Sequence, residues 1–225
     1  GSSNPIVAAF GKGRRLSLLS VTLIPMLAAI SFYVTFVWMA IYMTDIVKPP
    51  VPQAFAVNSA SLFLSIIIGF PPGGMISDYF GRRNTMTFGG LLLIVMGPIM
   101  VRLIAHGTAL TAFFAQTALG FSYAFYGGPM GAWLAESFPP EVRLTAISIG
   151  YNIGLGIVGG FSPALATYMV ETLGIYSPGY LYTIFGILSL IGLYIVPTHN
   201  EVALEEEISD RHEPSALPPL ITKDD

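Results

Sequence analysis

The sequence predicts an all-α polytopic membrane protein with six transmembrane helices. The 225-residue chain is 53% hydrophobic and only 10% charged, whereas a soluble domain usually carries about 25% charged residues. Many of its acidic residues crowd into the C-terminal region, so the body of the chain is more apolar than the average. Six apolar stretches are long enough to cross the hydrocarbon of a bilayer, which takes about 20 helical residues.

The six stretches follow one another with short links. The links carry prolines, glycines and charges, which are typical of turns and membrane interfaces. A buried soluble bundle is the alternative, but its helices would show polar stripes at helical spacing, and these stretches lack them. Helices also suit lipid because every backbone polar group is then paired within its own segment. In chain order the stretches cover residues 16–46, 54–77, 85–105, 108–137, 144–173 and 180–197.

The basic residues predict the orientation, because cytoplasmic loops carry an excess of Lys and Arg. With a cytoplasmic N-terminus, the outer side holds Lys48 and Arg102. We therefore expect both termini in the cytoplasm. The inner side then holds six basic residues: Lys12, Arg14, Arg15, Arg82, Arg83 and Arg143.

Three regions follow from this topology. Residues 1–15 form a cytoplasmic N-terminal segment, and residues 16–197 form the six-helix transmembrane domain. Residues 198–225 are acidic and proline-bearing with few large apolar side chains, a composition typical of a disordered tail. The chain opens with Gly-Ser-Ser rather than Met, and we expect it to be part of a longer protein.

The composition also excludes several kinds of chemistry. The chain has no cysteine, which removes disulfides and thiolate metal sites. No histidine and carboxylate pair has metal-ligand spacing, and there is no phosphate-binding glycine loop, catalytic serine constellation or basic nucleic-acid patch. We expect no cofactor, no metal and no nucleic-acid partner, and we expect that the protein is not an enzyme.

The residue types in the charged loop between the second and third stretches suggest what the loop does. Asp78 ends one helix, Gly81 permits a tight turn, and Arg82 and Arg83 supply rigid forks for carboxylates or helix-end carbonyls. Such a group can hold neighbouring helices together at the inner face and release them when the helices move. The alternative is a basic loop that only anchors two helices at the interface.

The spacing of Gly74, Asp78, Gly81, Arg82 and Arg83 resembles the G-x-x-x-D-x-x-G-R-R signature of the major facilitator superfamily. That signature lies between the second and third helices of each half of the family's fold. The resemblance implies a cytoplasmic gating motif.

A second element begins at Glu136 and ends at Arg143. It resembles the E-x-F-P-x-x-x-R pattern that ends the tenth helix in the same superfamily. The run at residues 149–154 is most similar to metabolite:proton symporters such as proline/betaine, oxoglutarate and shikimate carriers. Sugar porters share the E-x-F-P-x-x-x-R element, but residues 197–201 depart from the P-E-T-K-G-like sequence that usually follows their last helix.

Both elements fall at equivalent places if the chain is the C-terminal half of a twelve-helix fold. The resemblance then implies secondary active transport of a small polar metabolite, an organic acid or zwitterion, coupled to protons and working by alternating access. The implied partners are the solute, protons, the lipid bilayer and a missing N-terminal six-helix half. A sugar-porter-like carrier and a truncated, non-transporting six-helix membrane protein remain alternatives.

Uncharged polar and aromatic residues are the candidates for a substrate cavity, since the deep positions of this half are nearly free of charge. We expect the proton-carrying carboxylate in the missing half. On the first helix, Tyr33, Trp38 and Tyr42 share one side. Aromatic residues at membrane interfaces and amides that bridge helices are the competing interpretation. The candidates are Tyr33, Trp38, Asn58, Gln116, Tyr123, Tyr126 and Asn152.

The fifth stretch is rich in glycine. Gly150 with Gly154, and Gly156 with Gly160, each fit G-x-x-x-G, which lets helix backbones approach closely. Close packing within the half is one interpretation. A sliding surface for alternating access is the other.

Overall fold

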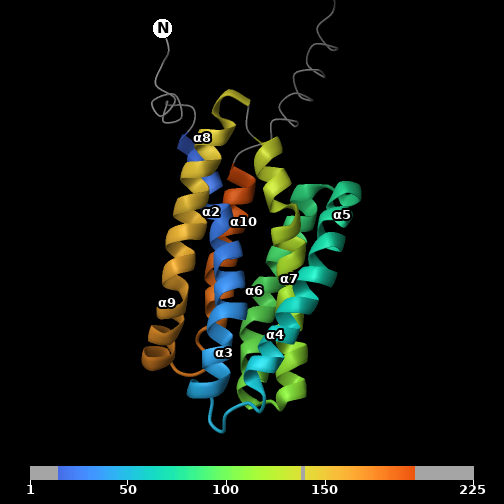
Figure 1. Cartoon of the computed structure of the whole chain (residues 1–225). Coiled ribbons are helices and arrows are strands. Elements are labelled where there is room, and N and C mark those ends of the chain that lie inside the picture. The colour runs from blue at the N-terminus through green and yellow to red at the C-terminus, as the bar shows by residue number, and fades with distance from the viewer. Residues whose placement is uncertain (1–14, 138–139, 196–225) are drawn as a thin grey trace, which may run out of the picture.

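The computed structural model describes residues 15–137 and 140–195, which form a bundle of helices (Figure 1). Six helical rods run up and down this described bundle in turn, so consecutive rods are joined at alternate ends. The all-α prediction is confirmed. The first residues of the chain and the acidic tail lie outside the described residues.

The first rod joins α2 (Arg15–Phe32), η1 (Tyr33–Trp38), α3 (Met39–Ile41) and η2 (Tyr42–Ile46). The second joins α4 (Ala54–Leu64), η3 (Ser65–Gly69) and α5 (Phe70–Phe80). The third is α6 (Arg82–His106) and the fourth is α7 (Ala109–Glu136). The fifth joins α8 (Pro140–Tyr151), η4 (Asn152–Ile157) and α9 (Val158–Leu173), and the sixth is α10 (Gly179–Ile195).

The link between the second and third rods is shorter than the sequence predicts. The second stretch was expected to end at residue 77 and the third to begin at residue 85, but α5 continues to Phe80 and α6 begins at Arg82. Gly81 alone makes the turn, with a φ of 88° that a residue with a side chain rarely adopts. As a result, the charged residues around it are held on helix ends instead of in a loop.

Four of the rods are long and apolar enough to cross a membrane by length and composition. They are the first, second, third and fifth. The helix α10 is apolar but shorter, with 17 residues described, and α7 has 28 residues but carries buried polar groups such as Gln116 and Ser122. Because α7 is largely enclosed by its neighbours, it needs less apolar surface than a helix that faces lipid.

The core lies where α2, α6, α7 and α10 meet. Ile24, Leu93, Tyr126 and Tyr182 are fully buried there. The Tyr126 hydroxyl on α7 donates to the Ile24 carbonyl on α2 at 2.9 Å. This buried hydroxyl therefore has a hydrogen-bond partner on a neighbouring helix. Close packing and interhelical hydrogen bonds of this kind hold helices together where lipid supplies no hydrophobic drive.

π-Helical segments interrupt three of the rods. In η3 the Phe70 N–H bonds the Ser65 carbonyl, five residues back, immediately before Pro71 and Pro72. Because proline has no N–H to continue the regular ladder, a widened turn at this point is a known response. In the first rod, η1 turns two carbonyls toward side chains of other helices, as described below.

Candidate functional site

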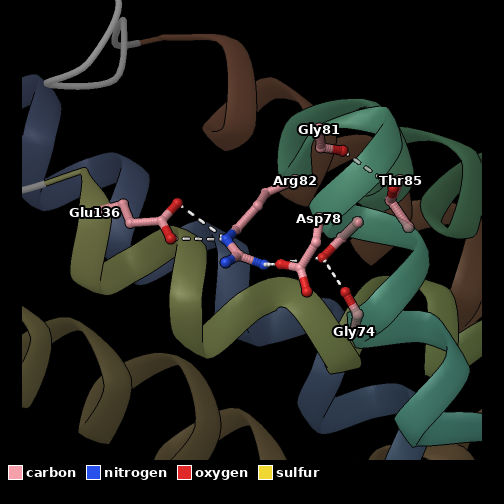
Figure 2. A network of polar contacts seen from close by, with 7 residues as sticks. Gly74, Asp78, Gly81, Arg82, Thr85 and Glu136 are labelled. Atoms are coloured by element: carbon pink, nitrogen blue, oxygen red, sulfur yellow. Dashed lines mark hydrogen bonds and ion pairs between the residues drawn. The ribbon is translucent and has the colours of Figure 1, made fainter.

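The polar cluster around Arg82 joins three helices at one end of the bundle. Figure 2 shows the Arg82 guanidinium between the carboxylates of Asp78 on α5 and Glu136 at the end of α7. Arg82 Nη1 lies 2.9 Å from Asp78 Oδ1, and Arg82 Nε lies 2.8 Å and 2.9 Å from the two Glu136 oxygens. We call these three residues with Ser77 the Arg82 cluster.

The turn at Gly81 sets this geometry. Asp78 lies near the end of α5 and Arg82 begins α6, so the tight turn brings the two side chains together and the ion pair forms across it. The Gly81 carbonyl accepts from the Thr85 hydroxyl at 3.0 Å and from the Thr85 N–H at 3.1 Å, which caps the start of α6. The Ser77 hydroxyl donates to the Gly74 carbonyl at 2.6 Å.

Solvent exposure keeps the Arg82 cluster weak. The side chains of Arg82, Asp78 and Glu136 are 25%, 59% and 44% exposed. Exposed ion pairs contribute only about 0–1 kcal/mol each. The cluster therefore ties α5, α6 and α7 together without locking them.

The other members of the predicted gating motif are partly described. Arg83 lies with its guanidinium carbon 5.3 Å from the centre of the Tyr194 ring on α10. The side chain of Arg143 lies outside the described residues. Sequence reasoning missed Ser77, whose hydroxyl accepts from Arg82 Nη1 at 2.9 Å; its position next to Asp78 was the available signal.

A second polar group lies deep between the first, second and fourth rods. The Gln116 side chain is fully buried, and its Nε2 donates to the Thr35 carbonyl at 2.6 Å and to Asn58 Oδ1 at 2.5 Å. Asn58 Nδ2 in turn donates to the Phe36 carbonyl at 2.9 Å. Both carbonyls belong to η1, so the two predicted cavity amides meet at the π-helical segment of the first rod.

The aromatic side of the first rod packs on the fifth. The Trp38 indole donates to the Thr167 hydroxyl at 2.9 Å, and the Tyr42 hydroxyl donates to the Ile175 carbonyl at 2.6 Å. Tyr33 lies against Gly159. Tyr33 and Trp38 therefore face α9, and Tyr42 faces the link that follows it. Trp38 is only 1% exposed, whereas Tyr33 is half-buried.

The remaining cavity candidates differ in exposure. Tyr126 is fully buried in the core described above. Tyr123 is 8% exposed and stacks edge-on against Phe70, with ring centres 5.0 Å apart. Asn152 is exposed at the start of η4, where its amide donates to the Ser148 carbonyl at 2.7 Å.

The two glycine pairs of the fifth rod face different surroundings. A Cβ on Gly154 would lie 2.5 Å from the Thr22 carbonyl oxygen, and one on Gly150 would lie 2.5 Å from Val21. Around Gly156 and Gly160 nothing lies within 4 Å of such an atom. The first pair thus allows close contact with α2, and the second lies on an open face of the half.

The apolar rods and the Arg82 cluster define an integral membrane protein of the helical, polytopic class. The family profile of the Major Facilitator Superfamily matches residues 21–222. The chain therefore belongs to this superfamily.

Two relatives show which kinds of transporter the chain is similar to. The chain is 29% identical over 176 residues to a citrate-proton symporter of Klebsiella pneumoniae, covering 74% of this chain and 40% of that protein. It is 28% identical over 145 residues to a proline/betaine transporter of Escherichia coli (strain K12), covering 62% of this chain and 29% of that protein. The chain thus spans less than half the length of these relatives.

A solved structure supports the fold independently. The bundle resembles the crystal structure of a mutant of the peptide transporter POT in complex with sulfate, with a TM-score of 0.64 at 17% sequence identity. The match covers 93% of this chain and 48% of that transporter. It confirms the expected fold, with this bundle equivalent to part of a larger helical carrier.

Proposed function

We propose that the protein forms the C-terminal half of a carrier that moves a small polar metabolite across the membrane with protons, by alternating access. The solute class is an organic acid or a zwitterion. Two relatives, a citrate-proton symporter and a proline/betaine transporter, support this class because citrate is a small organic acid and proline and betaine are small zwitterions. The bundle, residues 16–197, pairs with an N-terminal six-helix half to enclose the solute near the bilayer midplane.

The geometry of the Arg82 cluster is the main support for this mechanism. It joins the ends of α5, α6 and α7 through partly exposed ion pairs. A carrier must open and reclose its cytoplasmic face in every cycle, so contacts worth about 0–1 kcal/mol each suit a gate better than a buried, rigid pair would. We place this end, and both chain termini, on the cytoplasmic side of the plasma membrane.

Three of the cavity candidates have the accessibility that a solute contact needs. Tyr33, Asn58 and Asn152 are half-buried or exposed and carry hydrogen-bonding groups. Trp38, Gln116 and Tyr126 are enclosed within the half, and Tyr123 is nearly so. We assign the first three to the cavity wall and the other four to the support behind it.

Uptake into proteoliposomes by the full-length carrier tests the proposal. Labelled organic acids, betaine, proline and sugars are offered with and without an inward proton gradient. Accumulation of one solute only when the gradient is present is the expected result. Protein shown to be folded that takes up none of them under either condition contradicts proton-coupled metabolite transport.

Replacement of Asp78 tests the gating role. Asp78→Asn removes one charge that faces Arg82 while keeping the shape of the side chain. We expect uptake to fall by up to about fivefold, the rate equivalent of about 1 kcal/mol, while membrane insertion and thermal unfolding stay close to wild type because an exposed pair contributes at most about that much. Asp45→Asn is the matched control, since Asp45 is an exposed acid at the opposite end. Normal uptake by Asp78→Asn removes the gating role from the cluster.

A further inference from the structure

A pocket opens at the end of the bundle opposite the Arg82 cluster. The last turns of α6 and the link between α9 and α10 enclose about 370 Å³, next to a second hollow of about 570 Å³. Arg102, Tyr176 and Tyr180 line both. We call these hollows the Arg102 pocket. Since α6 has 25 residues, and each residue adds about 1.5 Å of length, the pocket and the Arg82 cluster lie about one membrane thickness apart.

The pocket presents a cation, Arg102, that has no counter-ion among the described residues. The Arg102 guanidinium carbon lies 5.0 Å from the centre of the Tyr176 ring, and the Tyr176 hydroxyl is hydrogen-bonded to His106 Nε2. Among the described residues, no carboxylate lies within ion-pair distance of Arg102, and neither pocket lining includes an acidic side chain. Cations on membrane helices are costly and usually functional.

Apolar surface leads away from the pocket along two adjacent helices. The backbones of α6 and α10 meet closely where Gly97 approaches Gly179. Spacings of three and four residues place exposed side chains on one face of each helix, and Ile99 belongs to the pocket lining itself. These side chains, about half exposed, are Ile99, Val95 and Leu91 on α6 and Ile184, Ile187 and Ile191 on α10.

We propose that the Arg102 pocket binds the phosphodiester headgroup of an anionic phospholipid in the leaflet opposite the Arg82 cluster. Arg102 pairs with the phosphate, held in place by its stacking on Tyr176. The acyl chains lie along the exposed stripes of α6 and α10. A basic side chain beside such stripes matches both parts of a phospholipid, whereas a free anion would use only the pocket.

Native mass spectrometry of the purified full-length protein in detergent measures this binding without any transport step. The probes are phosphatidylglycerol, phosphatidylcholine, glycerophosphoglycerol without acyl chains, and inorganic phosphate. Arg102→Gln removes the charge, and Arg102→Lys keeps it. Lys48→Gln is the matched control, because Lys48 is another exposed basic residue at this end and does not line the pocket. Thermal unfolding of each variant verifies that it is folded.

We expect phosphatidylglycerol to bind at least about fivefold more weakly to Arg102→Gln, the effect of one basic residue on an anionic lipid. Arg102→Lys keeps most of the affinity, and Lys48→Gln keeps all of it. Equal binding by folded Arg102→Gln and wild type overturns the proposal, as does equal binding of phosphatidylcholine. If glycerophosphoglycerol or inorganic phosphate binds as tightly as the lipid, the pocket is a free-anion site and the lipid proposal fails.

Discussion

Gln116 is the residue whose environment is hardest to satisfy in the described bundle. Its Nε2 serves two acceptors, the Thr35 carbonyl and Asn58 Oδ1, while its Oε1 is buried without a hydrogen-bond partner among the described residues. An unmet buried acceptor costs about 1–3 kcal/mol. The Gln116 side chain thus makes two stabilising hydrogen bonds between rods and also buries one unpaired oxygen. Its net effect on the free energy of unfolding can be measured.

Gln116→Leu tests that balance. Interhelical hydrogen bonds in membranes contribute about 0.6 kcal/mol each, so losing two, with Asn58 Oδ1 left unpaired, should lower the free energy of unfolding by about 1 kcal/mol. Thr117→Val is the control, because the Thr117 hydroxyl donates a single long bond of 3.3 Å. Unfolding of the purified protein in a denaturing detergent measures both. A Leu variant more stable than wild type would mean that the unmet Oε1 outweighs the two bonds.

Residue positions were predictable where local spacing determines them. The sequence placed Asp78 and Arg82 on either side of a tight turn at the inner face, and the topology placed Glu136 at the same end. The structure joins the three side chains by ion pairs. The contacts of Gln116 were not predictable. They depend on which carbonyls η1 turns outward, and no residue type in residues 33–38 indicates a π-helical turn.

The fifth rod shows how one sequence pattern serves two surfaces. Both glycine pairs fit G-x-x-x-G, yet only Gly150 and Gly154 touch α2. Gly156 and Gly160 are exposed and do not share that contact. Close packing accounts for the first pair. The second pair meets nothing within the described bundle, so the sliding-surface interpretation still applies to it.

Alanine substitutions separate the two pairs. Gly154→Ala would drive a methyl group into the backbone of α2, and overpacking of this kind costs about 1–3 kcal/mol. Gly156→Ala meets nothing, so its stability should be unchanged or rise by up to about 1 kcal/mol, because glycine loses more backbone freedom on folding than alanine does. Thermal unfolding of the two purified variants makes the comparison. Equal losses from both would show that Gly156 is also packed.

Element type was predictable, and element ends were less so. Long apolar stretches predicted helices because lipid permits few other structures, and the all-α fold agrees. The predicted link between the second and third rods was too long, because the charged residues between them were assigned to a loop. In the structure Gly81 alone forms the turn. Asp78 belongs to the end of α5, and Arg82 and Arg83 belong to the start of α6. The π-helical segments were not foreseen.

At the scale of the whole molecule, the bundle has different chemistry at its two ends. The Arg82 cluster pairs its charges internally and joins three helices. At the other end, Arg102 faces a pocket with no acidic partner in its lining. The first arrangement suits a contact that breaks and reforms within the protein, and the second suits an anion supplied from outside it.

The distribution of carboxylates bears on proton coupling. Outside the Arg82 cluster, the acidic side chains that the structure describes are Asp45 and Glu171, and both are exposed near the end opposite that cluster. A proton-carrying group in a membrane carrier is expected within the bundle interior or a water-filled cavity. On the proposed function, we expect the coupling carboxylate in the other half of the carrier.

The double variant Asp45→Asn/Glu171→Gln tests this placement in the full-length carrier. We expect uptake to keep its dependence on an inward proton gradient, within about twofold of wild type, because neither side chain lies where a proton must be carried. The measurement compares uptake with the gradient imposed and with the gradient collapsed by an ionophore. Loss of the gradient's effect, with uptake down the solute gradient retained, would move the coupling site into this half. Each single variant would then identify the carboxylate responsible.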